Sequence, residues 1–425
     1  MKRLFTNIGK LVQVEQGEPV IKRAGNDMSV LITIDNAFLA VEDGIISDFG
    51  TMDTLSNLAE KGVEYWPENQ ADELIDLKGA FVLPSFCDSH THLVYAGSRE
   101  REFIDKIRGL SYKEIAARGG GILNSAKLLS ETSEENLFRQ SVVRAWEIIS
   151  NGTAAVEIKS GYGLNSQDEI KMLRVAKRIG EETPLTVKTT FLGAHAVPPR
   201  YAGRKGDYVD EIINEMIPVI ATEELADYID VFTEEGFFSV EDTDRILNAG
   251  MKYGLRAKVH ANQMSFSGGV QVGVKYNAIS VDHLEFTGDE EFALLKNSET
   301  MATLLPGSTF FMEMEYANAR KMIDSGLAVA LATNYNPGSS PYGDMRFMMA
   351  LGALKYKMTT EELINAVTIN GAYAMGLSDN QGSIARGKRA SFIVTKNIPS
   401  LDFLPYTFTS PFIEQIWIGG VKILV

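Results

Sequence analysis

Two histidines separated by one residue end an apolar run in the first quarter of the chain. The run is Phe81-Val-Leu-Pro-Ser-Phe-Cys-Asp-Ser-His-Thr-His-Leu93. In a β-strand, residues i and i+2 point to the same side, so His90 and His92 would project together, about 6–7 Å apart. Because neutral imidazole is the commonest protein ligand for metal ions, the pair indicates a metal site. The alternative is a pair of surface histidines.

The remaining histidines favour the metal site. The sequence has only five histidines in 425 residues, and His195, His260 and His283 each close a short apolar run. In a (β/α)₈ barrel the carboxyl ends of all strands meet at one mouth, so side chains that are distant in sequence converge there. The pattern therefore predicts one shared metal centre rather than separate buried histidines.

The chemistry of such a centre follows from the number of ligands. Three nitrogens from His90, His92 and His260 would leave one zinc or iron ion with open coordination positions, as in catalytic sites. The ion would lower the pKa of bound water from 15.7 to about 7, so that hydroxide is available for attack. His195 and His283 would remain for proton transfer or for polarising a carbonyl. These residues predict metal-assisted hydrolysis.

Other polar residues near the same strand ends suggest an anionic substrate. Arg99 lies in the loop after the His-x-His run, and its planar guanidinium suits a carboxylate. The backbone N–H groups around Gly338 and Ser339 could hold the same group, and Tyr162 could donate a hydrogen bond from the rim. The alternatives are a surface arginine, an ordinary turn and a packing tyrosine.

The middle of the chain alternates between short apolar runs and amphipathic stretches. Ser166–Ile179 is one such stretch, with its apolar residues at helical spacing, and a closing helix is expected at Glu361–Met375, capped by Thr360 and ended at Gly376. Strands are expected at Ala80–Phe86, Thr153–Lys159, Leu185–Leu192, Tyr228–Thr233, Arg256–Val259, Ile279–Val281, Thr300–Leu305 and Ala328–Ala332. Strand–helix alternation predicts an α/β fold with a (β/α)₈ barrel, and a doubly wound sheet is the runner-up.

Both ends of the chain contain hairpin signals. Extended runs flank Asp43-Gly44 near the start and Gly419-Gly420 near the end. Neither end alone buries much apolar surface, so we expect one small β-sandwich domain built from both. The predicted domains are therefore 1–79 plus 377–425 for the composite β domain and 80–376 for the barrel.

The composition favours a small-molecule partner. The chain has 41 basic and 56 acidic side chains, and its net charge of −15 disfavours nucleic acid and anionic membranes. No apolar run reaches the roughly 20 residues of a membrane span. The single cysteine, Cys87, cannot form an internal disulfide, which favours the cytoplasm. An anionic substrate would need a local cation, for which Arg99 is the candidate.

Several segments resemble a known family. Leu83-Pro-Ser-Phe-Cys-Asp-Ser-His-Thr-His92 resembles the Pro-Gly-x-x-Asp-x-His-x-His opening of the amidohydrolase superfamily, and the continuation looks like its imidazolonepropionase family. The supporting segments are Ala96-Gly-Ser-Arg-Glu-Arg-Glu-Phe103, Gly119-Gly-Gly-Ile122, Glu157-Ile-Lys-Ser-Gly-Tyr-Gly-Leu164, Lys258-Val-His-Ala-Asn-Gln263, Val281-Asp-His-Leu284 and Asn336-Pro-Gly-Ser-Ser340. They occur in the expected order along nearly the whole chain.

The resemblance implies a reaction and assigns roles. The reaction would be hydrolysis of the cyclic amide of 4-imidazolone-5-propanoate to N-formimidoyl-L-glutamate on one zinc or iron ion, commonly in a homodimer. His90, His92 and His260 match the family's metal ligands, and His283 matches the histidine that assists attack on the ring carbonyl. The substrate-contacting positions would be Arg99, Tyr162, His195, Gln263, Asn336, Gly338 and Ser339, of which Gln263 is also counted with the catalytic residues.

Two positions depart from the family pattern. Asn334 replaces an Asp that contacts the metal and shuttles a proton, and an amide can offer its oxygen to an ion but cannot move a proton. Ser391 replaces an Asp in the β domain, where we expect a small effect on stability. The alternatives are therefore a catalytically impaired or substrate-trapping homologue, or another amidohydrolase such as a deaminase, which the carboxylate-binding residues disfavour.

Overall fold

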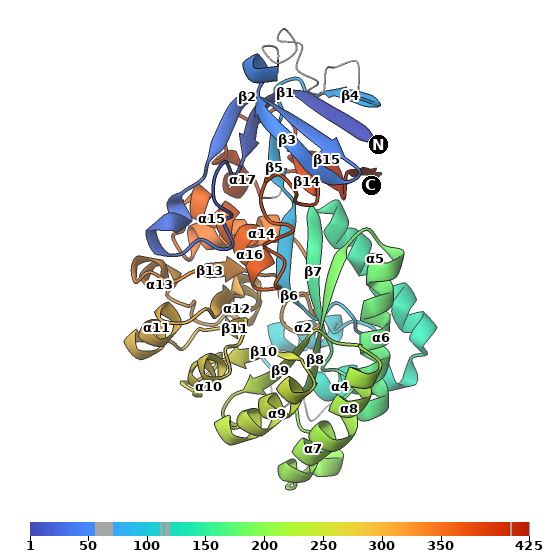
Figure 1. Cartoon of the computed structure of the whole chain (residues 1–425). Coiled ribbons are helices and arrows are strands. Elements are labelled where there is room, and N and C mark those ends of the chain that lie inside the picture. The colour runs from blue at the N-terminus through green and yellow to red at the C-terminus, as the bar shows by residue number, and fades with distance from the viewer. Residues whose placement is uncertain (56–70, 111–113, 115–119, 409, 425) are drawn as a thin grey trace.

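The structure contains two eight-stranded sheets, one of which closes into a barrel. The computed structural model describes residues 1–55, 71–110, 114, 120–408 and 410–424, so Gly119 of the predicted glycine-rich segment lies outside the described residues. In Figure 1 the barrel and its helices form the larger part, and the sheet built from both termini lies at one end of it. Among the described residues, no helix is long and apolar enough to cross a membrane.

The barrel strands are parallel and follow one another in chain order. They are β6 (Phe86–Thr91), β7 (Thr153–Lys159), β8 (Thr186–Ala194), β9 (Tyr228–Thr233), β10 (Arg256–Ala261), β11 (Ser280–His283), β12 (Met301–Leu304) and β13 (Val329–Leu331). The ring closes between β6 and the residues after β13, where the Asn334 N–H donates to the His90 carbonyl and the His92 N–H to the Tyr335 carbonyl, each at 2.9 Å. The predicted (β/α)₈ barrel is confirmed.

Helices connect and cover these strands. They are α2 (Glu100–Ile107), α4 (Ile122–Glu131), α5 (Glu134–Ser150), α6 (Ser166–Glu182), α7 (Lys205–Glu211), α8 (Ile217–Thr222), α9 (Val240–Lys252), α10 (Gly269–Lys275), α11 (Asp289–Lys296), α12 (Pro306–Met312), α13 (Ala319–Asp324), α14 (Met345–Leu354), α15 (Thr360–Val367), α16 (Ile369–Tyr373) and α17 (Phe403–Tyr406). Helix α6 is the helix predicted from Ser166. The Asn165 side chain caps it by accepting from the Asp168 N–H at 2.9 Å, and its apolar face is buried.

Two of the predicted elements are each divided in the structure. The run from Ala80 to Phe86 is not one barrel strand, because β5 (Phe81–Pro84) pairs with strands of the terminal sheet and only β6 enters the barrel. The predicted strand followed the apolar residues, which cover β5 but only the first part of β6. The closing helix begins after Thr359, whose side chain forms a capping box with Glu362, and it breaks at Thr368 into α15 and α16.

The second sheet combines both ends of the chain, as predicted. Its order is β16 (Val421–Ile423), β15 (Ile413–Ile418), β14 (Phe392–Thr395), β5, β1 (Lys2–Val12), β2 (Thr33–Glu42) and β3 (Ile45–Thr51), with β4 (Glu73–Asp76) also paired to β1. Because β5 belongs to this sheet and β6 to the barrel, the strands favour a domain boundary at Ser85. The predicted division into 1–79 plus 377–425 and 80–376 nevertheless stays a prediction.

Both predicted hairpins form, and their turns meet. Asp43 and Gly44 have φ of 49° and 83°, and Gly419 and Gly420 have φ of 56° and 74°, as tight hairpin turns require. The Ala390 N–H donates to the Gly44 carbonyl and the Gly420 N–H to the Ala390 carbonyl, so one residue joins the two turns. The turns therefore hold the two ends of the chain in one sheet.

Candidate metal centre and active site

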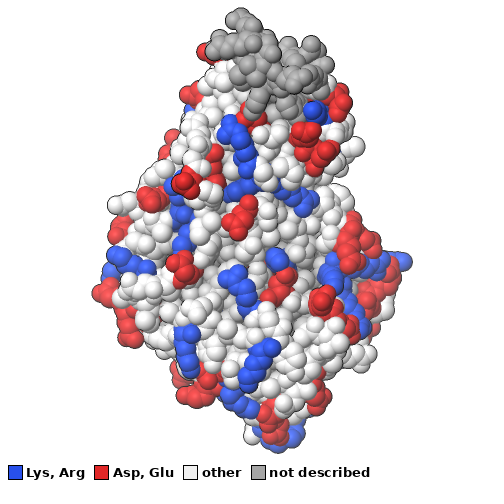
Figure 2. All heavy atoms as spheres, viewed as in Figure 1, with Lys and Arg blue, Asp and Glu red and all other residues white. Residues whose placement is uncertain are grey.

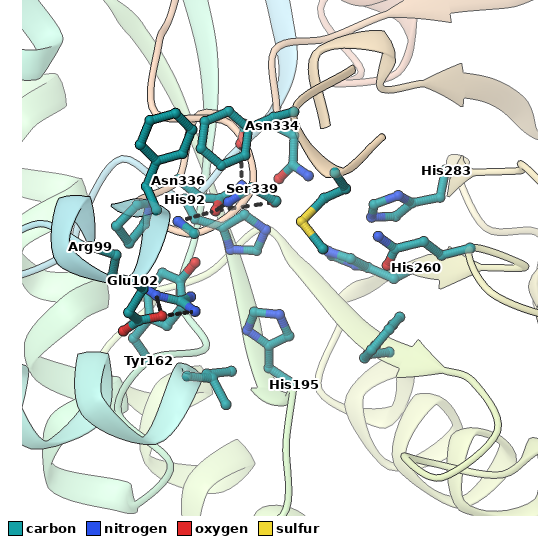
Figure 3. A pocket seen from close by; sticks show the side chains of 18 of the residues that line it. His92, Arg99, Glu102, Tyr162, His195, His260, His283, Asn334, Asn336 and Ser339 are labelled. Carbon is teal, nitrogen blue, oxygen red and sulfur yellow. Dashed lines mark hydrogen bonds and ion pairs between the residues drawn. The ribbon is translucent and has the colours of Figure 1, made fainter. Parts of the chain in front are cut away.

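The five histidines lie together at the carboxyl ends of the barrel strands. His90 is in β6 and His92 follows it, His195 follows β8, His260 is in β10, and His283 ends β11. The ring centroids of His90 and His260 are 4.5 Å apart, those of His92 and His195 are 5.2 Å apart, and those of His260 and His283 are 5.5 Å apart. The predicted convergence is therefore present in the structure, and Figure 3 shows four of these rings around one cavity.

Two of the histidines have side-chain contacts that suit binding of a metal ion. His90 Nδ1 lies 2.6 Å from Asp282 and His260 Nδ1 lies 2.9 Å from Asp230, so each carboxylate favours the tautomer with the proton on Nδ1. The Nε2 atoms of both rings are buried, and neither has a hydrogen-bond partner among the described residues. Burial lowers the pKa of both imidazoles, so their lone pairs stay available. The residues present therefore fit a metal ion.

The nearest set of donor atoms differs from the predicted one. Donor atoms of His90, His260 and His283 lie within 4.8 Å of one another. His92 is outside that set, although its ring centroid is 5.3 Å from that of His90 and its Nδ1 lies 3.4 Å from the Ser160 carbonyl. The Asn334 carboxamide is buried, and its Oδ1 has no partner among the described residues, so this oxygen could contribute as well.

A fully buried charge network supports the histidines from inside the barrel. Lys159 lies between the two carboxylates that orient the rings, with its Nζ 2.8 Å from Asp230 and 3.6 Å from Asp282, and it also pairs with Glu157 at 2.7 Å. Lys258 forms a second ion pair with Glu157. Burial favours the neutral amine of Lys159, but the surrounding carboxylates outweigh it and raise the pKa of this lysine above its usual value. The lysine is therefore charged and paired.

These acidic partners were not predicted, although the sequence contains a signal for them. In β7 the residues alternate, with Val156 and Ile158 in the apolar core and Glu157 and Lys159 in the charge network. Charged residues that alternate with apolar ones inside a strand point to a polar barrel interior. Asp230 has the same setting between apolar neighbours of β9.

A cavity of about 220 Å³ opens next to the histidines. Its lining contains all seven predicted substrate-contacting residues, which are Arg99, Tyr162, His195, Gln263, Asn336, Gly338 and Ser339. It also contains His92, His260, His283 and Asn334 from the predicted metal and catalytic residues. It also contains residues that the sequence analysis did not single out: Glu102, Phe103, Lys106, Ile122, Phe232, Phe311, Met312 and Pro337. The cavity therefore joins the strand ends to the region around α2.

At the α2 side of the cavity, Arg99 is held by two contacts. Its Nε lies 2.8 Å and its Nη2 2.6 Å from the Glu102 carboxylate, one helical turn away. Its Nη1 rests against Gly338, where a Cβ atom would overlap the guanidinium. The i,i+3 spacing of Arg99 and Glu102 could have predicted this pair. The guanidinium also lines the cavity, where it can meet a carboxylate.

Tyr162 and His195 line the same wall of the cavity. Burial raises the pKa of the Tyr162 phenol, which keeps it protonated and able to donate. Burial lowers the pKa of His195 to about 3, and its Nδ1 lies 3.1 Å from the Gly161 carbonyl. Nδ1 is therefore the protonated nitrogen, and the Nε2 lone pair can accept a hydrogen bond. Gly161 has φ of 113°, and a Cβ there would come within 2.8 Å of His195 Nδ1.

The loop after β13 differs from the predicted carboxylate cradle. The Gly338 and Ser339 N–H groups both donate to Asn336 Oδ1 at 2.8 Å, and Asn336 Nδ2 donates to the Asn334 carbonyl at 2.6 Å. An Asx turn thus uses the N–H groups that we expected to bind the substrate carboxylate. This leaves Arg99 as the principal candidate for that role.

Comparison with known proteins identifies the family. Residues 81–421 match the amidohydrolase family. An imidazolonepropionase from Flavobacterium johnsoniae is 53% identical over 420 residues, covering 99% of each chain. A triazine hydrolase variant superposes with a TM-score of 0.76 at 13% identity, covering 99% of this chain and 94% of its own. An adenosine deaminase from Xanthomonas campestris, solved with bound zinc, has a TM-score of 0.69 at 15% identity and covers 100% of this chain and 93% of its own.

The two solved structures show the fold alone, whereas the family match covers most of the chain. The chain therefore belongs to the amidohydrolase family. Within that family it belongs with the imidazolonepropionases, since relatives of that name are 51–53% identical to it over 99% of its length. The resemblance found in the sequence is confirmed.

Proposed function

We propose that this enzyme hydrolyses the ring amide of 4-imidazolone-5-propanoate to N-formimidoyl-L-glutamate. The oxygen of water bonds to the ring carbonyl carbon, the ring C–N bond breaks, and the departing nitrogen takes up a proton. The identity to imidazolonepropionases over 99% of the chain supports this reaction over that of a deaminase or of a homologue without activity.

One observation of the site carries the proposal. A cationic group and a cluster of histidines lie at two sides of the same cavity, with Arg99, Glu102 and Tyr162 at one side and His260 and His283 at the other in Figure 3. A substrate with a carboxylate on a short chain and a hydrolysable ring matches this layout. Figure 2 shows basic and acidic side chains interspersed over the face in view.

The polar groups of the cavity suggest how the substrate is held. Arg99 would pair with the propanoate. The Tyr162 O–H would donate to the same end, and the His195 Nε2 would accept from a ring N–H. His283 would assist the attack of water on the carbonyl, and Gln263 would orient the ring next to it.

One zinc or iron ion would complete the site. His90, His92 and His260 would hold it, with the Asn334 oxygen as a further ligand, and the unpartnered Nε2 atoms of His90 and His260 support this set. When bound, the ion supplies Lewis acidity for hydrolysis. Elemental analysis of the purified protein tests the identity and number of the ion, and removal by a chelator should abolish turnover until zinc or iron is restored.

The enzyme is also proposed to be a cytoplasmic homodimer. The buried, unpaired Cys87 suits a reducing compartment, and the dimer rests on the family resemblance. Light scattering on a gel-filtration column measures the mass of the particle, and a monomer would contradict the second part of the proposal.

The decisive experiment is an assay with synthetic 4-imidazolone-5-propanoate. The metal-loaded protein should consume it and release N-formimidoyl-L-glutamate, identified by mass spectrometry. Because Asn334 cannot relay a proton, Asn334→Asp is assayed beside it. The proposal fails if neither protein consumes the substrate.

A further inference from the structure

A buried carboxylate lies behind His283, which ends β11. Glu285 follows it by two residues, and both side chains are almost fully buried, at 3% exposed for His283 and 2% for Glu285. The Glu285 Oε2 lies 3.7 Å from His283 Nδ1. The other oxygen, Oε1, accepts a hydrogen bond from the Thr309 hydroxyl at 2.8 Å, which fixes the carboxylate in place.

The two facing atoms both lack partners. His283 Nδ1 and Glu285 Oε2 are buried, and neither has a hydrogen-bond partner among the described residues. A buried polar atom without a partner is costly, and these two atoms lie only 3.7 Å apart. A shift of less than about 1 Å would bring them to the roughly 2.7–2.9 Å of a charge-assisted hydrogen bond. Hydrogen bonds of this kind often tighten only when the substrate binds.

The backbone at this point supports a functional role. His283 and Leu284 have φ of 92° and 69°, in a region that non-glycine residues seldom occupy. The turn is held by the Leu284 N–H, which donates to the Ala261 carbonyl at 3.1 Å, and by the Phe286 N–H, which donates to the Asn262 carbonyl at 2.9 Å. Such strain is typical of functional sites.

The neighbouring histidines show the same arrangement. Asp282 lies against Nδ1 of His90 and Asp230 against Nδ1 of His260, and in both rings the buried Nε2 has no hydrogen-bond partner among the described residues. Glu285 is the third carboxylate in the corresponding position. Glu285 differs from the two aspartates in one respect. It follows its histidine by two residues, whereas Asp282 and Asp230 lie on other strands than the histidines that they contact.

We propose that Glu285 is a positioning residue for His283. It accepts a hydrogen bond from Nδ1–H, selects that tautomer, and leaves the Nε2 lone pair facing the cavity, where it can accept a hydrogen bond from the attacking water. The role of His283 in this statement rests on the proposed function, whereas the tautomer does not depend on it.

The test combines a spectrum with kinetics. Zinc-loaded protein labelled with ¹⁵N-histidine gives long-range ¹H–¹⁵N spectra in which the two tautomers differ, and a His283→Gln variant identifies the signals among only five histidines. We expect His283 to carry its proton on Nδ1. In Glu285→Met that preference should be lost, and kcat for imidazolonepropanoate should fall about 10- to 100-fold with KM changed less than about threefold. Glu285→Gln retains an acceptor oxygen, so it should recover part of the tautomer preference and part of kcat.

Glu362→Met is the matched control, because Glu362 is also 2% exposed but caps α15 and pairs with Arg320. It should lower the melting temperature without changing the tautomer or kcat. The proposal is overturned if wild-type His283 carries its proton on Nε2, if Glu285→Met leaves the tautomer unchanged, or if the control lowers kcat equally. Failure of the wild type to hydrolyse imidazolonepropanoate would refute the proposed function, while the spectrum still decides the role of Glu285.

Discussion

The two sides of the cavity are built in different ways. At the histidine side, His90 and His260 are carried by barrel strands, and buried acids fix their rings. At the opposite side, Arg99 directly precedes α2. Phe103, in the same helix, is 42% exposed and stacks on Phe311 at a centroid distance of 5.3 Å. Strand ends fix the reacting groups, whereas the groups that select the substrate lie on a short helix and loops.

This contrast predicts that a substitution in the charge network of the histidine side lowers the stability of the whole fold. Lys159→Met would leave Asp230, Asp282 and Glu157 buried without their shared cation. Breaking a buried ion pair typically costs ~3–5 kcal/mol, so we expect a loss of that order in the free energy of unfolding, together with weaker zinc binding. Urea unfolding and zinc titration measure the two effects.

Lys275→Met is the control for this variant, since Lys275 forms an exposed ion pair with Asp244. It should leave both quantities nearly unchanged. If Lys159→Met is as stable as the control, the buried network does not support the site.

The second prediction concerns the proton path at the same side. Asn334→Asp introduces a group that can accept and deliver a proton. General acid–base catalysis typically contributes roughly 10²- to 10⁴-fold, so kcat should rise at least ~10-fold. Steady-state kinetics at fixed metal content measures this. Equal rates in the two proteins would mean that the proton does not pass through position 334.

The third prediction concerns the carboxylate side and should leave stability alone. Arg99→Ala removes the charge-assisted bonds to the propanoate and should raise KM by ~10- to 100-fold, the equivalent of about 1.5–3 kcal/mol. An analogue without the carboxylate should show a much smaller change. A parallel rise in KM for both compounds would contradict the assignment of Arg99.

The smallest predicted effect tests the packing of Arg99. Gly338→Ala places a methyl group where the Arg99 guanidinium lies, and the shifted arginine should raise KM by ~3- to 10-fold, which is about 1 kcal/mol. Gly206→Ala is the control, because a Cβ there meets no atom within 4 Å. Identical kinetics in both variants would show that Arg99 adjusts freely.

The same contrast explains what the sequence could reveal. His90, His92 and His260 were predictable as neighbours because strand ends converge in any closed barrel. The Arg99–Glu102 pair was predictable from its i,i+3 spacing. The Asx turn of Asn336 depends on side-chain hydrogen bonds within a loop, which periodicity does not describe. The division of 81–91 into β5 and β6 was missed because an apolar run says that a strand is buried, but not which sheet buries it.

The position of β5 has a consequence for synthesis of the chain. This strand pairs with β1 on one edge and with β14 on the other, and β14 leaves the ribosome on the order of 300 residues later. At a synthesis rate of about 5–20 residues per second, roughly 15–60 seconds pass between the synthesis of β5 and that of its partner β14. During that interval the nascent polypeptide presents an unpaired edge that other chains can join, so chaperone protection matters most before the last strands emerge.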